Sequence, residues 1–389
     1  MSTTEPIIPT LGLPGGDGLN IAALVGLFRH TTNSYKFVFF LALLDLLQRH
    51  RFDPDRLYTY AEITVEMLTL AWFAHTYFKL SFGAQDTIAK KLDALDLAPW
   101  DSQNLAGHDL RTLRAALAAS ELKDAARLMD FVPYRLLIPF LEPQLRGVDK
   151  GAWMVFENSM PAITNAHFLT ARPLYRFDSD DYRRCAGIVM HPDWATYLET
   201  HYPIIRGWAA WHWLQYMQRR NPATPAIASK LFPPAKRDTL ARQTKYWRAI
   251  LAHPERPELR CIYCGEVLTA ERFALDHYLP WSFVAHDQLW NLIPAPAVVN
   301  SAKSNRLPSA DYFRAFVDLQ HQGLLIARRS LSEGQFGKLI EDYLADLHLA
   351  SPEALLDRER LTRAYEQTIG PLITLATNQG FSPDWQYAR

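Results

Sequence analysis

The stretch DHYLPWSFVAHDQLWNLIPAPAVVNSAKSNRLP, residues 276–308, decides the local fold. Its polar side chains keep separations of 14, 9 and 3 positions, in the order His277, Asn291, Asn300 and Lys303. Asp276 directly precedes the histidine. We expect residues 273–277 to form a strand, Asn291 to follow a loop on a second strand, and a helix to start near Ala297. Such a ββα unit would bring the polar residues to one place.

These residue types suit the hydrolysis of a phosphodiester. The reaction needs a group that deprotonates water and a positive charge beside the phosphate and the departing oxygen. His277 can be the general base, because imidazole titrates near neutral pH. If the two residues lie on a strand, the side chain of Asp276 points to the face opposite that of His277. Asp276 can then bind a metal, with Asn300 as the second ligand. A carboxylate with an amide oxygen favours Mg²⁺, with Mn²⁺ or another divalent ion as the alternative.

Two further polar residues have expected roles beside this site. The amide of Asn291 would hold the loop by donating to and accepting from backbone groups, and so orient His277 indirectly. Lys303 shares a helical face with Asn300, from where it could contact a phosphate. We therefore count Asn291 and Lys303 with His277 as candidate catalytic residues.

These residues at these separations resemble the HNH endonuclease family, above all the HNH domain of RNA-guided CRISPR nucleases. The resemblance covers residues 261–308. It implies a ββα-metal fold in which Asp276 and Asn300 are the metal ligands, His277 is the general base and Asn291 is the structural asparagine. It also implies an endonuclease that leaves a 5′-phosphate. A late HNH module behind a helical region is similar to bacterial anti-phage and restriction-type defence nucleases.

Cys261 and Cys264 have the spacing of a zinc knuckle. Two thiolates cannot close a tetrahedral site, and the second pair that many HNH proteins carry is absent from residues 296–299. His253 or His286 could complete a zinc site, although neither has a convincing spacing. We favour instead a pair packed under the hairpin, with Val298 and Val299 in place of the metal, so structural Zn²⁺ is not expected.

Residues 219–260 are locally basic. They contain ten Lys and Arg residues against three acidic ones, in a chain whose formal net charge is zero. Such a run is often only a solvated face, but its position beside the expected nuclease site favours phosphate contact. The residues that we expect to bind nucleic acid are Lys236, Arg237, Arg242, Lys245 and Arg248.

The whole chain of 389 residues is expected to be mainly α-helical and multi-domain. Helical N- and C-terminal regions would surround the small ββα-metal module. We divide the sequence into four parts. Residues 1–218 are a helical region for target selection, regulation or partner binding, and residues 219–260 are a basic loop-helix segment. Residues 261–308 are the nuclease module, and residues 309–389 are a helical C-terminal region.

Three cysteines, and a beginning that lacks a basic, apolar leader, favour a cytoplasmic protein. The most apolar run, residues 37–47, contains Asp45 and is too short for a membrane span, so we expect a buried helix and no membrane partner. The function expected is a metal-dependent DNA endonuclease or nickase. Because one site cuts one strand, double-strand cleavage would take a homodimer or two visits, and defence-system proteins could be partners.

Two other functions fit the same residues. Water rather than a 2′-hydroxyl is the nucleophile at such a site, so RNA stays an alternative substrate. A non-catalytic nucleic-acid-binding subunit with a fossil HNH fold is an alternative of a different class. Cleavage of a 2′-deoxy substrate would distinguish the DNA nuclease from a ribonuclease. Mg²⁺ binding that is equal and negligible for wild type and Asp276→Ala would favour the non-catalytic subunit.

Overall fold

The computed structural model describes residues 12–29, 31–83, 86–95, 110–120, 125–149, 154–232 and 238–388. These residues form two compact units. The first takes in those between 12 and 222 except Tyr77–Lys79, and the second takes in Tyr77–Lys79 and those from 223 onward. The described chain is mainly helical, with one three-stranded and one two-stranded sheet. The predicted fold class is therefore confirmed.

In the first unit, helices surround a small antiparallel sheet whose middle strand is β3. Its strands are β1 (Leu57–Thr59), β2 (Tyr175–Phe177) and β3 (Gly187–Met190). Its α-helices are α1 (Ile21–Val25), α2 (Tyr35–Arg49), α3 (Tyr60–Trp72), α4 (Ile88–Asp93), α5 (Leu110–Ala119), α6 (Val132–Arg135), α7 (Val155–Ala166), α8 (Pro192–Thr200) and α9 (Tyr202–Arg220). Shorter helical turns are η1 (Gly26–Phe28), η2 (Phe73–Tyr77, whose last residue is counted in the second unit), η4 (Ala125–Met129), η5 (Ile138–Phe140) and η6 (Tyr182–Arg184).

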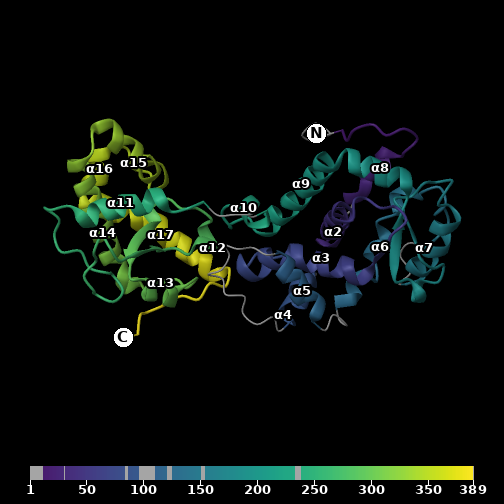
Figure 1. Cartoon of the computed structure of the whole chain (residues 1–389), viewed down its shortest axis with the longest axis horizontal. Helices are drawn as coiled ribbons and strands as arrows, with labels where there is room; N and C mark the ends of the chain where they lie inside the picture. The colour runs from purple at the N-terminus through teal and green to yellow at the C-terminus, as the bar shows by residue number, and fades with distance from the viewer. Residues whose placement is uncertain are drawn as a thin grey trace, which may run out of the picture. The chain divides into compact units, whose positions relative to one another are not determined.

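Helix α2 is the centre of the first unit. Its apolar side chains lie almost all round it and are buried, and it packs against α3 and α9 (Figure 1). Its acidic residue Asp45 is ion-paired with Arg206 of α9, with Nε and Oδ1 2.7 Å apart. The apolar run of residues 37–47 is therefore a buried helix, as predicted. Among the described residues, no helix has the length and apolarity that a membrane crossing requires.

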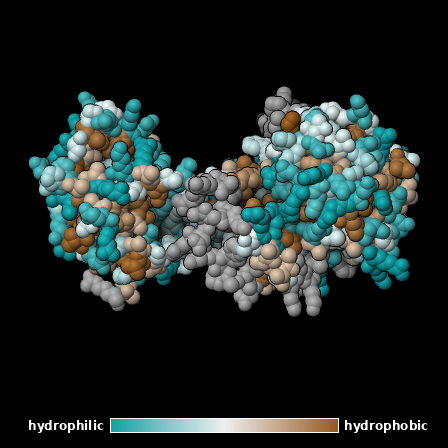
Figure 2. Space-filling view, in the orientation of Figure 1, coloured by the Kyte–Doolittle hydropathy of each residue, from teal (hydrophilic) through white to brown (hydrophobic). Residues whose placement is uncertain are grey.

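The second unit holds the β4–β5 hairpin and helices that share one hydrophobic core with it (Figure 1). Its strands are β4 (Ala274–His277) and β5 (Leu292–Ala295). Its helical elements are α10 (Ile227–Leu231), α11 (Ala241–Ala252), α12 (Trp281–Val284), η7 (Leu289–Asn291), α13 (Ala297–Lys303), η8 (Ala310–Tyr312), α14 (Phe313–Ser330), α15 (Glu333–Asp346), α16 (Pro352–Leu356) and α17 (Arg358–Asn378). On the visible face of this unit, apolar side chains form small patches among hydrophilic ones (Figure 2).

A short apolar run in the first unit, residues 136–138, could form a strand by its composition. It is helical instead, because Leu136 caps the end of α6 and Ile138 begins η5. Pro133 is the second residue of α6 and Pro139 the second residue of η5, and in a first turn a proline costs no helical hydrogen bond. The strands of this region are β2 and β3 instead.

Candidate active site

The conspicuous polar stretch folds as a hairpin followed by a helix, as predicted. Strands β4 and β5 are antiparallel, with Asp276 opposite Ile293 and His277 opposite Leu292. After β5, Pro296 caps α13, which packs back against β4. Asn291 is not on the second strand, however, but ends the 3₁₀ turn η7 directly before it. This ββα arrangement places the side chains of β4 and α13 close together.

Asp276 is almost completely buried, at 2% exposure. Its Oδ2 accepts a hydrogen bond from the hydroxyl of Tyr263 at 2.7 Å, and its Oδ1 lies 3.1 Å from the ammonium of Lys303. Burial, followed by the negative charge of Asp276, raises the pKa of Tyr263 well above its usual value, so this hydroxyl keeps its proton and donates. Both carboxylate oxygens are thus oriented by protein groups.

Lys303 lies inside the module rather than on its surface. Its side chain is fully buried, and its Nζ donates to the backbone carbonyl of His277 at 2.6 Å as well as to Asp276. The pKa of Lys303 is lowered by burial, while the charge of Asp276 acts in the opposite direction. Direct contact with a phosphate, which the helical position suggested, does not fit this burial. The geometry fits a role in holding Asp276 and the end of β4.

His277 faces a carboxylate that the sequence pattern did not single out. Its Nε2 lies 2.8 Å from Oδ1 of Asp287, and both side chains are only slightly exposed. The backbone carbonyl of Asp287 accepts a hydrogen bond from Gln243 of α11 at 2.8 Å. A carboxylate partner favours the imidazole tautomer protonated on Nε2, which leaves Nδ1 as the basic nitrogen. The arrangement can therefore orient a general base and stabilise its protonated form.

The backbone contacts expected of Asn291 are present. Its Oδ1 accepts from the backbone N–H of Leu279 at 2.8 Å, and its Nδ2 donates to the carbonyl of the same residue at 2.9 Å. Its own carbonyl accepts from the N–H of Tyr278 at 2.8 Å. The side chain is fully buried. Asn291 thus fixes the chain directly after His277, and with it the position of the imidazole.

Asn300 lies on α13, in the turn before Lys303, and is half-buried. Its Nδ2 donates to the carbonyl of Leu275 at 3.3 Å, beside Asp276 on β4. No described residue hydrogen-bonds its Oδ1. Asp276 and Asn300 therefore offer a carboxylate and an amide oxygen, which is the hard donor set that Mg²⁺ prefers.

A metal at these two residues would have to share Asp276 with Lys303. The buried ammonium already supplies one positive charge 3.1 Å from the carboxylate. Within the described residues, no group of three or more His, Cys, Asp or Glu side chains could hold an ion. The donor types fit a divalent ion that keeps most of its ligands as water or phosphate oxygens.

The Cys261–Cys264 turn is linked to the site through the tyrosine between them. Both cysteines are buried free thiols, and burial raises the pKa of Cys261 to about 12. Gly265, with φ +77°, closes the turn, where a side chain would be strained. Val299 is buried as expected, but Val298 is 64% exposed and does not replace a metal. The turn presents Tyr263 to Asp276.

Part of the basic segment lies beside the module. Helix α11 packs on it, since Trp247 donates from Nε1 to the carbonyl of Leu292 at 3.0 Å. Three basic side chains of α11 are exposed, namely Arg242, Lys245 and Arg248. Lys236 and Arg237 lie outside the described residues. Lys230, counted in the same run, is instead fully buried, and its burial lowers its pKa to about 7.

The C-terminal helices hold the turn that leads into β5. Gln320 of α14 donates to the carbonyls of Leu289, Trp290 and Leu292 at 3.1, 3.2 and 3.0 Å. The hydroxyl of Tyr365, on α17, donates to the Trp290 carbonyl at 2.9 Å. Buried glutamine and tyrosine side chains thus satisfy backbone groups that a two-stranded hairpin leaves unpaired. No sequence pattern marked these supports, because their partners are distant in the chain.

Comparison with protein-family models matches residues 261–309 to the HNH endonuclease family. Neither the curated proteins nor the solved structures gave a match. The matched segment begins at the cysteine turn that carries Tyr263 and ends just after α13. It therefore includes Asp276, His277, Asn291 and Asn300. Residues 261–309 therefore form an HNH endonuclease module.

Proposed function

We propose that this protein is a metal-dependent HNH endonuclease that nicks DNA, with His277 as general base and with Asp276 and Asn300 holding Mg²⁺. The observation that carries the proposal is the convergence of a buried, oriented carboxylate with a carboxylate-paired histidine on one ββα hairpin. By resemblance of its sequence, the proposed setting is bacterial defence against foreign DNA, in the cytoplasm.

The residues divide the chemistry between them. His277 accepts at Nδ1 the proton of a water molecule whose oxygen forms the new bond to phosphorus. Asp287 stabilises the resulting imidazolium across the 2.8 Å contact at Nε2. The bond from phosphorus to the 3′-oxygen breaks, and that oxygen takes a proton from solvent water, which leaves a 3′-hydroxyl and a 5′-phosphate. When bound, a divalent ion would neutralise charge on the phosphate and on the departing oxygen.

The other polar residues of the module act by positioning. Tyr263 and Lys303 fix the two oxygens of Asp276 and hold its carboxylate in one orientation. Asn291 fixes the backbone after His277 through Leu279. Preorganised groups of this kind favour catalysis because they need no rearrangement during the reaction.

The proposal is tested by nicking of supercoiled plasmid by the full chain in Mg²⁺. We expect wild type to convert plasmid to the open circle, and His277→Ala to lose this activity while keeping its fold. His253→Ala, on a histidine that follows α11 in the same unit, is the matched control and should nick as wild type does. Wild-type protein that leaves plasmid intact in Mg²⁺, Mn²⁺ and Ni²⁺ would refute the enzymatic function.

The substrate is tested with paired strands of one sequence in DNA and RNA. A nuclease that attacks with water needs no 2′-hydroxyl, so we expect the deoxy strand to be cut and its product to carry a 5′-phosphate. Cleavage of RNA alone would replace DNA by RNA in the proposal. Binding of DNA without cleavage of either strand would favour a non-catalytic binding subunit.

A further inference from the structure

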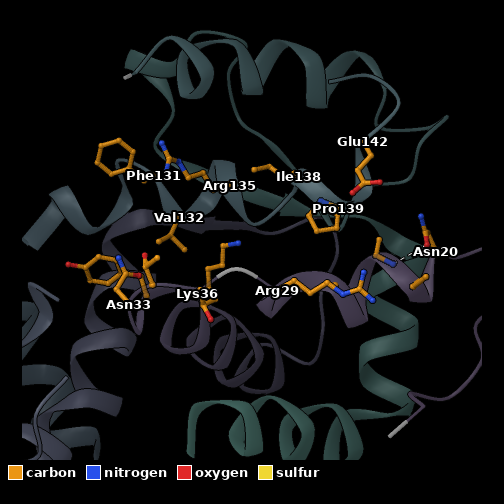
Figure 3. Close-up of a pocket in the computed structure, with 16 residues that line it drawn as sticks. Asn20, Arg29, Asn33, Lys36, Phe131, Val132, Arg135, Ile138, Pro139 and Glu142 are labelled. Atoms are coloured by element: carbon orange, nitrogen blue, oxygen red, sulfur yellow. Dashed lines mark hydrogen bonds between the residues drawn. The ribbon is translucent and has the colours of Figure 1, made fainter. Parts of the chain in front are cut away.

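The first unit contains a cavity of about 790 Å³ that is separate in sequence from the HNH module. One wall comes from α1, η1 and residues 31–36, and the other from α6 and η5 (Figure 3). This volume lies within the range of about 300–1,000 Å³ typical of small-molecule sites. The cavity is therefore large enough for a ligand of metabolite size.

The lining of this cavity carries an excess of positive charge. Arg29, Lys36 and Arg135 line it, against one carboxylate, Glu142. Arg135 has a partner behind the lining, because its Nε is 2.5 Å from the buried carboxylate of Glu157. Among the described residues, Arg29 and Lys36 have no ion pair. These two side chains therefore supply the positive charge of the lining that is not ion-paired, and Glu142 supplies its one negative charge.

Lys36 is the more informative of the two. Its pKa is lowered first by burial and then by the positive charge of Arg135. The folded chain thus holds a half-buried ammonium near the guanidinium of Arg135, which lowers the pKa of Lys36 even though it is itself paired with Glu157. Figure 3 shows the Lys36 side chain extending into the space between the two walls. An anion in the cavity would stabilise the charged ammonium against both effects.

The helix that carries Lys36 adds to the positive potential. Lys36 lies in the first turn of α2, a helix of 15 residues, whose N-terminus carries a partial positive charge. The carboxylate of Asp86 accepts from the N–H of Ser34 at 2.8 Å and offsets part of it. The N–H groups of Tyr35 and Lys36 have no partner among the described residues. They are donors of the kind that bind phosphate oxygens.

The other side chains that line the cavity suit a ligand with a flat, polar ring. Tyr35 and Phe131 bring aromatic rings to the cavity, and the guanidinium of Arg135 lies 5.2 Å from the Phe131 ring centroid. Asn33 brings an amide group that can pair with the edge of a base, and Asn20, whose Oδ1 accepts from the N–H of Ala23, adds only its Nδ2 donor. Aromatic faces stack bases, and cations bind phosphate.

We propose that this cavity binds a nucleoside phosphate, with Arg29 and Lys36 on the phosphate and the aromatic side chains beside the base. A free nucleotide and the phosphorylated end of a nucleic-acid strand share this chemistry. The site lies in the first unit and does not depend on nuclease activity of the second. It would give the N-terminal region a ligand of its own.

The test is isothermal titration of the full chain in EDTA, which keeps divalent ions from the HNH module. The probes are adenosine 5′-monophosphate, adenosine, inorganic phosphate, and a short single-stranded deoxyoligonucleotide with and without a 5′-phosphate. We expect the nucleotide or the phosphorylated strand to bind, and adenosine and phosphate to bind at least tenfold more weakly. Binding of only the phosphorylated strand would assign the site to a strand end.

Two variants and one control locate the binding. Lys36→Met and Arg29→Gln should each weaken binding about tenfold, the usual effect of losing a charge-assisted hydrogen bond. Lys36→Met removes an unpaired, half-buried charge, so its melting temperature should not fall. Arg183→Gln removes an exposed charge of the same unit away from the cavity and should bind as wild type does. The proposal is overturned if no nucleoside phosphate binds, if phosphate binds equally well, or if both variants bind normally.

Discussion

The imidazole of His277 is paired with Asp287, with Nε2 and Oδ1 2.8 Å apart. Asp287 follows the helix α12 in the loop between β4 and β5, and its backbone is held by Gln243 of α11. Thus a residue from outside the family-matched segment fixes the partner of the proposed base. Helix α11 therefore supports the site as well as carrying exposed basic residues.

We predict that Asp287→Asn lowers the plasmid-nicking rate by about tenfold to a hundredfold, the range found for residues that orient a functional group through a hydrogen bond. The amide keeps the shape of the side chain but not the charge that stabilises the imidazolium. The measurement is kcat for nicking at saturating plasmid. Asp318→Asn changes an exposed carboxylate on α14 in the same way and should leave kcat unchanged. Equal rates for Asp287→Asn and wild type would show that the pair does not act in catalysis.

We predict strong coupling between Asp276 and Lys303 in folding. Both side chains are buried, and removal of one partner leaves the other as an unpaired buried charge. Asp276→Ala and Lys303→Met should each lower the free energy of unfolding by roughly 3 kcal/mol or more. The double variant should lose much less than the sum of the two, because it leaves neither charge unpaired. Denaturant unfolding of all four proteins measures this, and losses that add within about 0.5 kcal/mol would exclude the coupling.

The parts of the candidate site that depend on local spacing could be predicted from the sequence. Asp276, His277 and Asn291 lie on one hairpin, so the chain itself brings them together once the strands pair. Asn300 follows on the next helix. The ββα unit and the bonds of Asn291 to the loop could be predicted for this reason.

The contacts that the sequence did not reveal depend on packing. Tyr263 lies between two cysteines whose spacing is typical of a zinc site. Its hydrogen bond to Asp276 depends on how the turn folds, which the sequence pattern does not give. The inward direction of Lys303 follows from the core around α13, since a helical position alone does not give the depth of a side chain. In the first unit, the short apolar run of residues 136–138 fits a strand or a helix equally well, and the nearby Pro133 and Pro139 lie in the first turns of helical elements.

We predict that His286 makes the protein less stable in mild acid. Its imidazole is packed against the Trp290 ring, with centroids 5.2 Å apart, and burial lowers its pKa from 6.5 to about 4. Between these pH values the unfolded chain binds a proton that the folded chain does not. Stability is therefore complete above pH 6.5 and falls as the pH approaches 4, by up to about 3 kcal/mol from this residue.

The measurement is the free energy of unfolding of wild type and His286→Phe at several pH values. The phenylalanine keeps an aromatic ring against Trp290 but cannot take up a proton. Its stability should depend less steeply on pH between 6.5 and 4, so the difference between the two proteins should change across this window. Parallel profiles would mean that His286 is protonated equally in the folded and unfolded chain.

We predict that the exposed basic residues of α11 contribute to DNA affinity through phosphate contact. Arg242→Gln, Lys245→Gln and Arg248→Gln should each weaken binding and lower the slope of log K against log salt by about one. The weakening should be similar for unrelated DNA sequences, because phosphates carry no base information. Binding is measured in EDTA with His277→Ala as the parent, which prevents cleavage. Lys338→Gln, on an exposed position of α15, is the matched control and should keep the parental slope. If the triple α11 variant also keeps that slope, DNA reaches the module by another surface.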